Sequence, residues 1–66
     1  MRIFFNEQQL ETNETSLFGV MKEQQLAEKK GIAVAVNDEV IPRAQWGELS
    51  VAEDDAILVI TAAAGG

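Results

Sequence analysis

The sequence contains no cysteine and no histidine. It therefore lacks the side chain that titrates nearest neutrality, the most reactive biological thiol and two of the usual zinc ligands. Disulfides, zinc fingers, CxxC redox chemistry and catalysis by Ser-His or Cys-His pairs are excluded within these 66 residues. We expect no resident metal and no active site of these kinds.

Positively charged side chains are also few: five Lys and Arg stand against eleven Asp and Glu, for a formal net charge of -6. A protein that binds nucleic acid must neutralise phosphates with a basic face, so we expect no nucleic-acid partner. The acidic excess could dock a basic partner, but a solvated surface is the simpler interpretation of any single residue. The run Glu53-Asp54-Asp55 lacks the spaced ligands of a calcium loop and is interpreted as a turn.

Long hydrophobic runs are absent. The longest, residues 56–64 with Thr61 inside it, is far too short to span a bilayer, and residues 3–5 are too few for an export signal. We therefore expect a soluble, cytoplasmic protein with no membrane partner. A chain of this length buries only about 60% of its unfolded surface, which predicts one small domain that works with larger partners.

The first residues predict a β-hairpin. Residues 2–5 are β-branched and aromatic, Asn6-Glu7 is turn chemistry, and an extended pattern resumes over 8–12. Period-two alternation places Met1, Ile3 and Phe5 on one face and Phe4 on the other.

One helix is predicted next. Thr15 or Ser16 can cap its start, and 29–31, Lys-Lys-Gly, is a typical stop signal. The apolar residues expected on its buried side are Leu17, Val20, Met21 and Leu26. Gly19 is a poor helix former, and we interpret it as a site of close helix-to-sheet packing.

The second half predicts three further strands. Residues 32–36 are entirely apolar, 40–41 form a short strand, and 57–60 are apolar on both faces and so expected in the centre of the sheet. Between them, Pro42 begins a helical turn through Trp46. The order of elements predicts an α+β fold of the ubiquitin-like β-grasp kind, with a small mixed sheet packed on one main helix.

The last residues are the most informative. After Thr61 the side chains shrink to alanine and then to Gly65-Gly66, a pair that chance gives in roughly one chain in two hundred. A frayed terminus is the simple interpretation. The functional one is a thin arm that enters another protein's active site, because glycine has no Cβ. We accordingly divide the chain into a β-grasp domain, 1–61, and a flexible diglycine tail, 62–66.

The group that such a tail delivers is the α-carboxylate of Gly66, which is ionised at neutral pH and unreactive as an acyl donor. It becomes reactive when its oxygen attacks the α-phosphate of ATP to form an acyl adenylate. The sequence has no glycine-rich phosphate loop with a lysine, so activation requires a partner.

A resemblance to a known family rests on several of these features together. The opening 3–6, Val36-Asn37, the segment Ile41-Pro42-Arg43 with Trp46, and the diglycine end are similar to the ThiS family, the sulfur carriers of thiamine biosynthesis. The turn 53–55 differs in lacking the glycine often found there.

The resemblance implies a carrier and not an enzyme, with no bound cofactor. An E1-like adenylyltransferase of the ThiF type would consume ATP to adenylate Gly66, with Gly65 and Ala64 inside its active site. Sulfur from a cysteine desulfurase or another donor would make the thiocarboxylate, and a ThiG-type thiazole synthase would accept it. The alternatives are a carrier like the small subunit of molybdopterin synthase and a non-covalent ubiquitin-like interaction module. A hydrolase that uses carboxylates is disfavoured by the small size of the chain.

Overall fold

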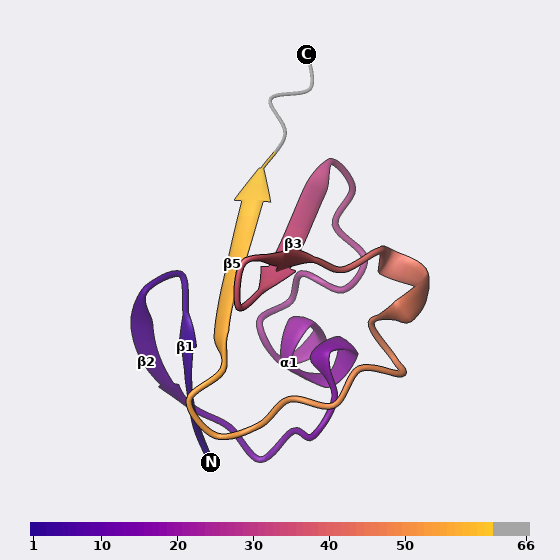
Figure 1. Ribbon diagram of the computed structural model, residues 1–66. Coiled ribbons are helices and arrows are strands. Elements are labelled where there is room, and N and C mark those ends of the chain that lie inside the picture. Colours follow the sequence, from indigo (N-terminus) through magenta and orange to yellow (C-terminus); the bar gives the residue numbers. More distant parts are fainter. Residues whose placement is uncertain (62–66) are drawn as a thin grey trace.

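Five strands in residues 1–61, the part of the chain that the computed structural model describes, form one sheet in the order β2-β1-β5-β3-β4 (Figure 1). The elements are β1 Arg2–Phe5, β2 Gln8–Glu11, α1 Leu17–Glu23, β3 Ile32–Val36, β4 Glu39–Val40, the 3₁₀ turn η1 Arg43–Gln45 and β5 Ala56–Thr61.

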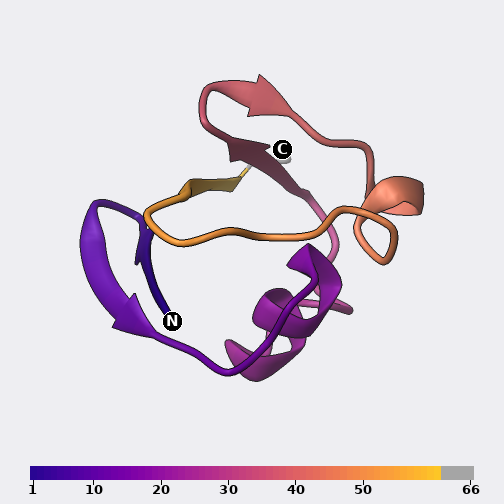
Figure 2. The same cartoon turned by 60° about the horizontal axis from the view of Figure 1, so that its bottom comes forward.

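The sheet is mixed. β1 and β5 run parallel, and the other neighbouring pairs are antiparallel. α1 lies on the concave side of the curved sheet, between the β1–β2 hairpin and the strands of the second half (Figure 2). The predicted arrangement of a small mixed sheet on one main helix is confirmed, as are the first hairpin and the central position of β5.

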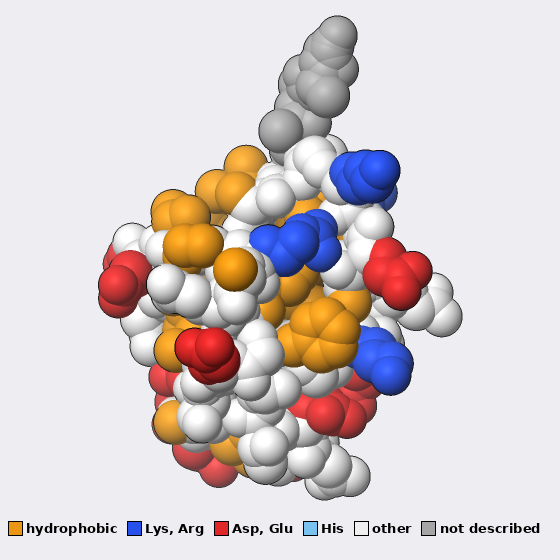
Figure 3. Space-filling model, turned by 90° about the vertical axis from the view of Figure 1, so that its right-hand side faces the viewer, with side chains coloured by type: hydrophobic (Ala, Val, Ile, Leu, Met, Phe, Trp, Pro, Cys, Tyr) orange, Lys and Arg blue, Asp and Glu red, His pale blue; other side chains and the backbone are white. Residues whose placement is uncertain are grey.

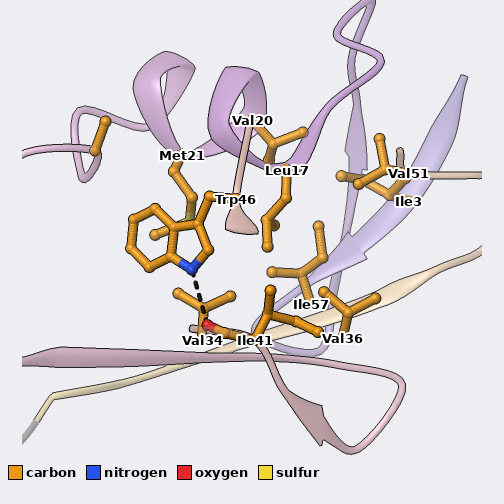
Figure 4. Close-up of a cluster of buried hydrophobic side chains, with 11 residues drawn as sticks. Ile3, Leu17, Val20, Met21, Val34, Val36, Ile41, Trp46, Val51 and Ile57 are labelled. Atoms are coloured by element: carbon orange, nitrogen blue, oxygen red, sulfur yellow. Dashed lines mark hydrogen bonds between the residues drawn. The ribbon is translucent and has the colours of Figure 1, made fainter. Parts of the chain in front are cut away.

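The core fills the space between α1 and the sheet (Figure 4). Three residues of the helix are fully buried: Leu17, Val20 and Met21. They face apolar residues of the strands, of which Ile3, Val34 and Ile57 are almost completely buried. At about 1.5–3 kcal/mol for each fully buried aliphatic side chain, this cluster is the main stabilising contribution to so small a domain. The alternation in β1 is as predicted, since Met1 and Phe5 also pack against this cluster.

The helix begins where predicted and ends earlier. Ser16 is the N-cap, and its hydroxyl oxygen accepts a hydrogen bond from Gly19 N at 3.0 Å. The predicted stop at 29–31 is wrong, because the helix ends at Glu23. Gln25 takes a left-handed φ of 64°, its N–H donates to Lys22 O, and Leu26 N donates to Met21 O. These bonds form a Schellman motif with glutamine in the usual place of glycine.

Gly19 has a different neighbour from the one expected. A Cβ at this position would collide with the side chain of Glu14, which lies over the glycine. The predicted close approach of helix and sheet is therefore wrong, and the small residue makes room for the segment that precedes the helix.

The hairpin between β3 and β4 is tighter than expected. Asn37 and Asp38 form a two-residue turn with φ of 52° and 72°, so Val36 pairs with Glu39. The strand predicted at 40–41 accordingly lies at Glu39–Val40. Ile41 leaves the strand and enters the core, while its N–H still donates to Val34 O at 2.9 Å.

Candidate functional site

β5 is the strand that leads toward the predicted tail, and it is held along its length. It pairs with β3 from Val36↔Ile57 to Ile32↔Thr61, and its start pairs with β1. Thr61 therefore lies at the end of the sheet where β3 begins. Gly66 lies five positions after Thr61 in the sequence.

Two asparagines fix the start of β5 from its two sides. Asn6 accepts from Val59 N through Oδ1 at 2.8 Å, and its own N–H donates to Ile57 O. Asn37 Oδ1 accepts from Ala56 N at 3.0 Å, and Asn37 N donates to Ala56 O. Both residues have φ of 52°. Sequence reasoning identified them as turn residues and missed this side-chain role, although asparagine both tolerates such φ values and bonds nearby backbone.

The Ile-Pro-Arg-x-x-Trp segment has a structural role. Trp46 is only 1% exposed, and its indole N–H donates to Ile41 O at 2.9 Å (Figure 4). The Arg43 guanidinium lies 4.5 Å from the Trp46 ring centroid and donates to the carbonyls of Ala27 and Lys29. Trp46 therefore belongs to the core and covers one end of it. Arg43 joins this cover to the chain between α1 and β3.

The acidic turn is occupied by internal contacts. Asp54 has φ of 70°, a conformation that glycine adopts more readily, and its Oδ1 accepts from Arg2 Nη2 at 2.7 Å. This hydrogen bond and the charge of Asp54 raise the pKa of Arg2. Glu53 accepts from Arg2 N, and Asp55 accepts from Ala52 N. The interpretation of 53–55 as a turn is confirmed, and residues 1–61 contain no cluster of acidic side chains suited to a metal ion.

The outer face of the sheet, opposite α1, is apolar and exposed. Val40 is 63% exposed, Ile60 49% and Leu58 42%. The register brings them together, because Ala35 pairs with both Leu58 and Val40 and Ala33 pairs with Ile60. We call Val40, Leu58 and Ile60 the open face. The sequence showed that β5 is apolar on both faces, but the helix covers only one of them.

The predicted site residues Ala64, Gly65 and Gly66 lie outside the described residues, as does the whole of the predicted tail, 62–66. The structure places the strand that precedes them and not the residues themselves. Their roles and the division at residue 61 stay predictions.

Comparison with known proteins decides the family. The model of the ThiS family matches residues 2–66. The sulfur carrier protein ThiS of Escherichia coli (strain K12) is 33% identical over 66 residues, which are the whole of both chains. The chain belongs to the ThiS family. The resemblance on which the sequence analysis relied is confirmed.

A ThiS fold is also found by structural comparison. The crystal structure of the thiamine biosynthesis protein ThiS from Geobacter metallireducens superposes with a TM-score of 0.81 at 17% identity, covering 92% of this chain and 93% of that one. The predicted ubiquitin-like β-grasp fold is thereby confirmed. In this ThiS-family chain, none of the helices within residues 1–61 has the length and apolar character that a membrane span requires.

Proposed function

We propose that this ThiS-family chain carries sulfur as a thiocarboxylate on Gly66 and donates it to thiazole formation in thiamine biosynthesis. The observation that carries the proposal is the course of β5, a central strand that is paired up to Thr61, five residues before Gly66. Five residues span at most about 18 Å. A partner that holds Gly66 must therefore also lie close to the end of the sheet at Thr61.

The chemistry proceeds in two steps at the carboxyl group of Gly66. An oxygen of the Gly66 carboxylate attacks the α-phosphate of ATP, and pyrophosphate leaves. A persulfide sulfur of the donor then attacks the acyl carbon and AMP leaves. A thiol of a partner cleaves the S–S bond of the resulting acyl disulfide, which releases the thiocarboxylate and leaves a disulfide between that thiol and the donor. Glycine suits this carbon because no side chain obstructs the incoming nucleophile.

The chain itself supplies the acyl group and leaves catalysis to its partners. The sequence has no phosphate loop, histidine or cysteine for either step. We therefore assign ATP binding to an E1-like adenylyltransferase, sulfur supply to a cysteine desulfurase or similar donor, and sulfur acceptance to a thiazole synthase. These ATP-dependent steps belong in the cytoplasm.

The open face is the surface that we assign to partner docking. It carries three exposed apolar side chains, and two of them, Leu58 and Ile60, belong to the strand that leads to the tail. Exposed apolar groups gathered in one place are typical of interaction surfaces. A partner seated there is within reach of Gly66.

Intact-mass spectrometry tests the proposal. The chain is incubated with the adenylyltransferase, ATP and a sulfur source, and the expected product is heavier by one exchange of oxygen for sulfur at the C-terminus. No exchange, under conditions in which the E. coli relative is converted, would overturn the proposal. A chain without Gly66 is the matched control, because it should keep its fold and lose conversion.

The open face also favours a second candidate, a non-covalent interaction module. The same control separates the two functions. A module that binds through the open face retains its partner without Gly66, whereas a carrier without Gly66 transfers no sulfur.

A further inference from the structure

A second surface lies on the helix side of the molecule. Phe18, Lys22, Gln25, Ala27 and Glu28 line an open hollow of about 350 Å³ between α1 and the segment that follows it. Phe18 is 42% exposed, although its neighbours Leu17 and Val20 are fully buried. An aromatic ring thus stands at the surface, beside a concave site that the core does not use.

The positive charges of the chain gather around this hollow. Lys22 lines it, Lys29 and Lys30 follow directly after its lining residues, and Arg43 donates to the carbonyls of Ala27 and Lys29. Figure 3 shows Lys and Arg side chains grouped around exposed hydrophobic surface on this side. We call Phe18, Lys22, Lys29 and Lys30 the basic face.

Four of the five cations therefore lie on one side of a chain with net charge -6. The fifth, Arg2, is engaged with Asp54, and the ion pairs found within residues 1–61 involve only Arg2 and the N-terminus as cations. No carboxylate of residues 1–61 pairs with the basic face. Glu28 is the one acidic residue that lines the hollow.

Part of the basic face lies next to the end of the sheet at Thr61. Lys29 and Lys30 are separated from β3 by Gly31 alone, and the first residue of β3, Ile32, pairs with Thr61. Because Gly66 is at most about 18 Å from Thr61, an enzyme that holds Gly66 must approach this end of the sheet. It then meets the basic face as well as the open face.

We propose that the basic face binds an acidic segment of the adenylating partner, with carboxylates opposite Lys22 and Lys29 and an apolar side chain against Phe18. The inference rests on the proposed function and deepens it. Adenylation brings the anionic terminus of an acidic chain toward the phosphates of ATP, and like charges oppose this approach. Ion pairs near the end of the sheet at Thr61 offset that repulsion and set the orientation of docking.

The occupant is a protein segment and not nucleic acid. Outside the basic face the chain carries eleven acidic residues against two further cations, Arg2 and Arg43, and a polyanion would be repelled there. A folded partner can present a local acidic patch to the basic face while it keeps its other surface neutral or basic.

The test is a comparison of two charge-matched variants of the full chain. Lys22→Gln/Lys29→Gln removes two charges from the basic face, and Gln8→Glu/Asn13→Glu lowers the net charge equally at exposed positions of the first hairpin and the loop after it. The measurement is ATP–pyrophosphate exchange by a ThiF-type adenylyltransferase as a function of carrier concentration, at low and at high salt.

We expect the first variant to raise KM about fivefold at low salt, the effect of losing two exposed ion pairs, with kcat unchanged. The control should change KM less than about twofold, and high salt should remove the difference. Equal KM values for the two variants would overturn the inference while exchange with the unaltered chain still supports the proposed function. No exchange with the unaltered chain would remove both. If only the control variant lost exchange, the acidic segment of the partner would lie opposite the first hairpin, and this would contradict the inference.

Discussion

Replacing Arg43 with alanine tests the contact between η1 and the chain that joins α1 to β3. The guanidinium donates to the carbonyls of Ala27 and Lys29 and lies 4.5 Å from the Trp46 ring centroid. Because the site is partly exposed, we assign about 0.5–1 kcal/mol to each hydrogen bond and about 0.5–1 kcal/mol to the cation–π contact. The expected loss of unfolding free energy is about 2 kcal/mol.

Thermal unfolding followed by circular dichroism measures this loss. At about 4–8 °C for each kcal/mol in a domain of this size, Arg43→Ala should lower Tm by about 10 °C. Arg43→Lys keeps the charge without the planar fork, and should lose about half as much. Lys30→Ala is the matched control, since it removes a cation from the joined segment without removing any hydrogen bond found in residues 1–61.

If Arg43→Ala and Lys30→Ala lower Tm by the same amount, then the guanidinium does not hold the segment and its contacts contribute nothing measurable. Amide exchange supplies a local check, because residues 27–29 should exchange faster in Arg43→Ala than in the control.

Three further predictions concern the helix end, the core and the open face. Gln25→Gly should raise the unfolding free energy by about 0.5 kcal/mol, because φ of 64° suits glycine; a lower Tm would contradict this. Trp46→Phe should cost about 2–3 kcal/mol in urea unfolding, since it leaves the Ile41 carbonyl without its donor and leaves a cavity; a loss below about 1 kcal/mol would refute it. Leu58→Ser/Ile60→Ser should raise KM for adenylation while Tm stays within about 3 °C, and an unchanged KM would exclude the open face as the docking surface.

The elements that could be predicted are those with strong local patterns. The alternation in β1 and the apolar runs of β3 and β5 were predicted from the sequence, as was a helix cap at Thr15 or Ser16, and the fold follows from the order of these elements. The helix end could not be predicted in the same way. Gly31 matched the usual stop signal, whereas the helix actually ends at a left-handed Gln25. The left-handed φ costs free energy at a non-glycine residue, and the packing of Leu26 against the core offsets this cost.

Only part of the candidate site could be predicted from the sequence. The motif with Arg43 and Trp46 could be found in the sequence, but their contacts depend on residues sixteen and five positions away. The open face was hidden, because an apolar strand in the sequence does not show which side a single short helix leaves uncovered. Gly66 was identified from composition and position, and its role stays a prediction that chemistry must test.

The state of the Gly66 carboxyl group after incubation is the most direct test of the account. The full chain is treated with a ThiF-type adenylyltransferase, ATP and a sulfur donor, and its C-terminal peptide is then analysed by tandem mass spectrometry. The account predicts one oxygen replaced by sulfur, located on Gly66 and dependent on ATP. An unchanged carboxylate, or sulfur found on any other residue, would contradict it.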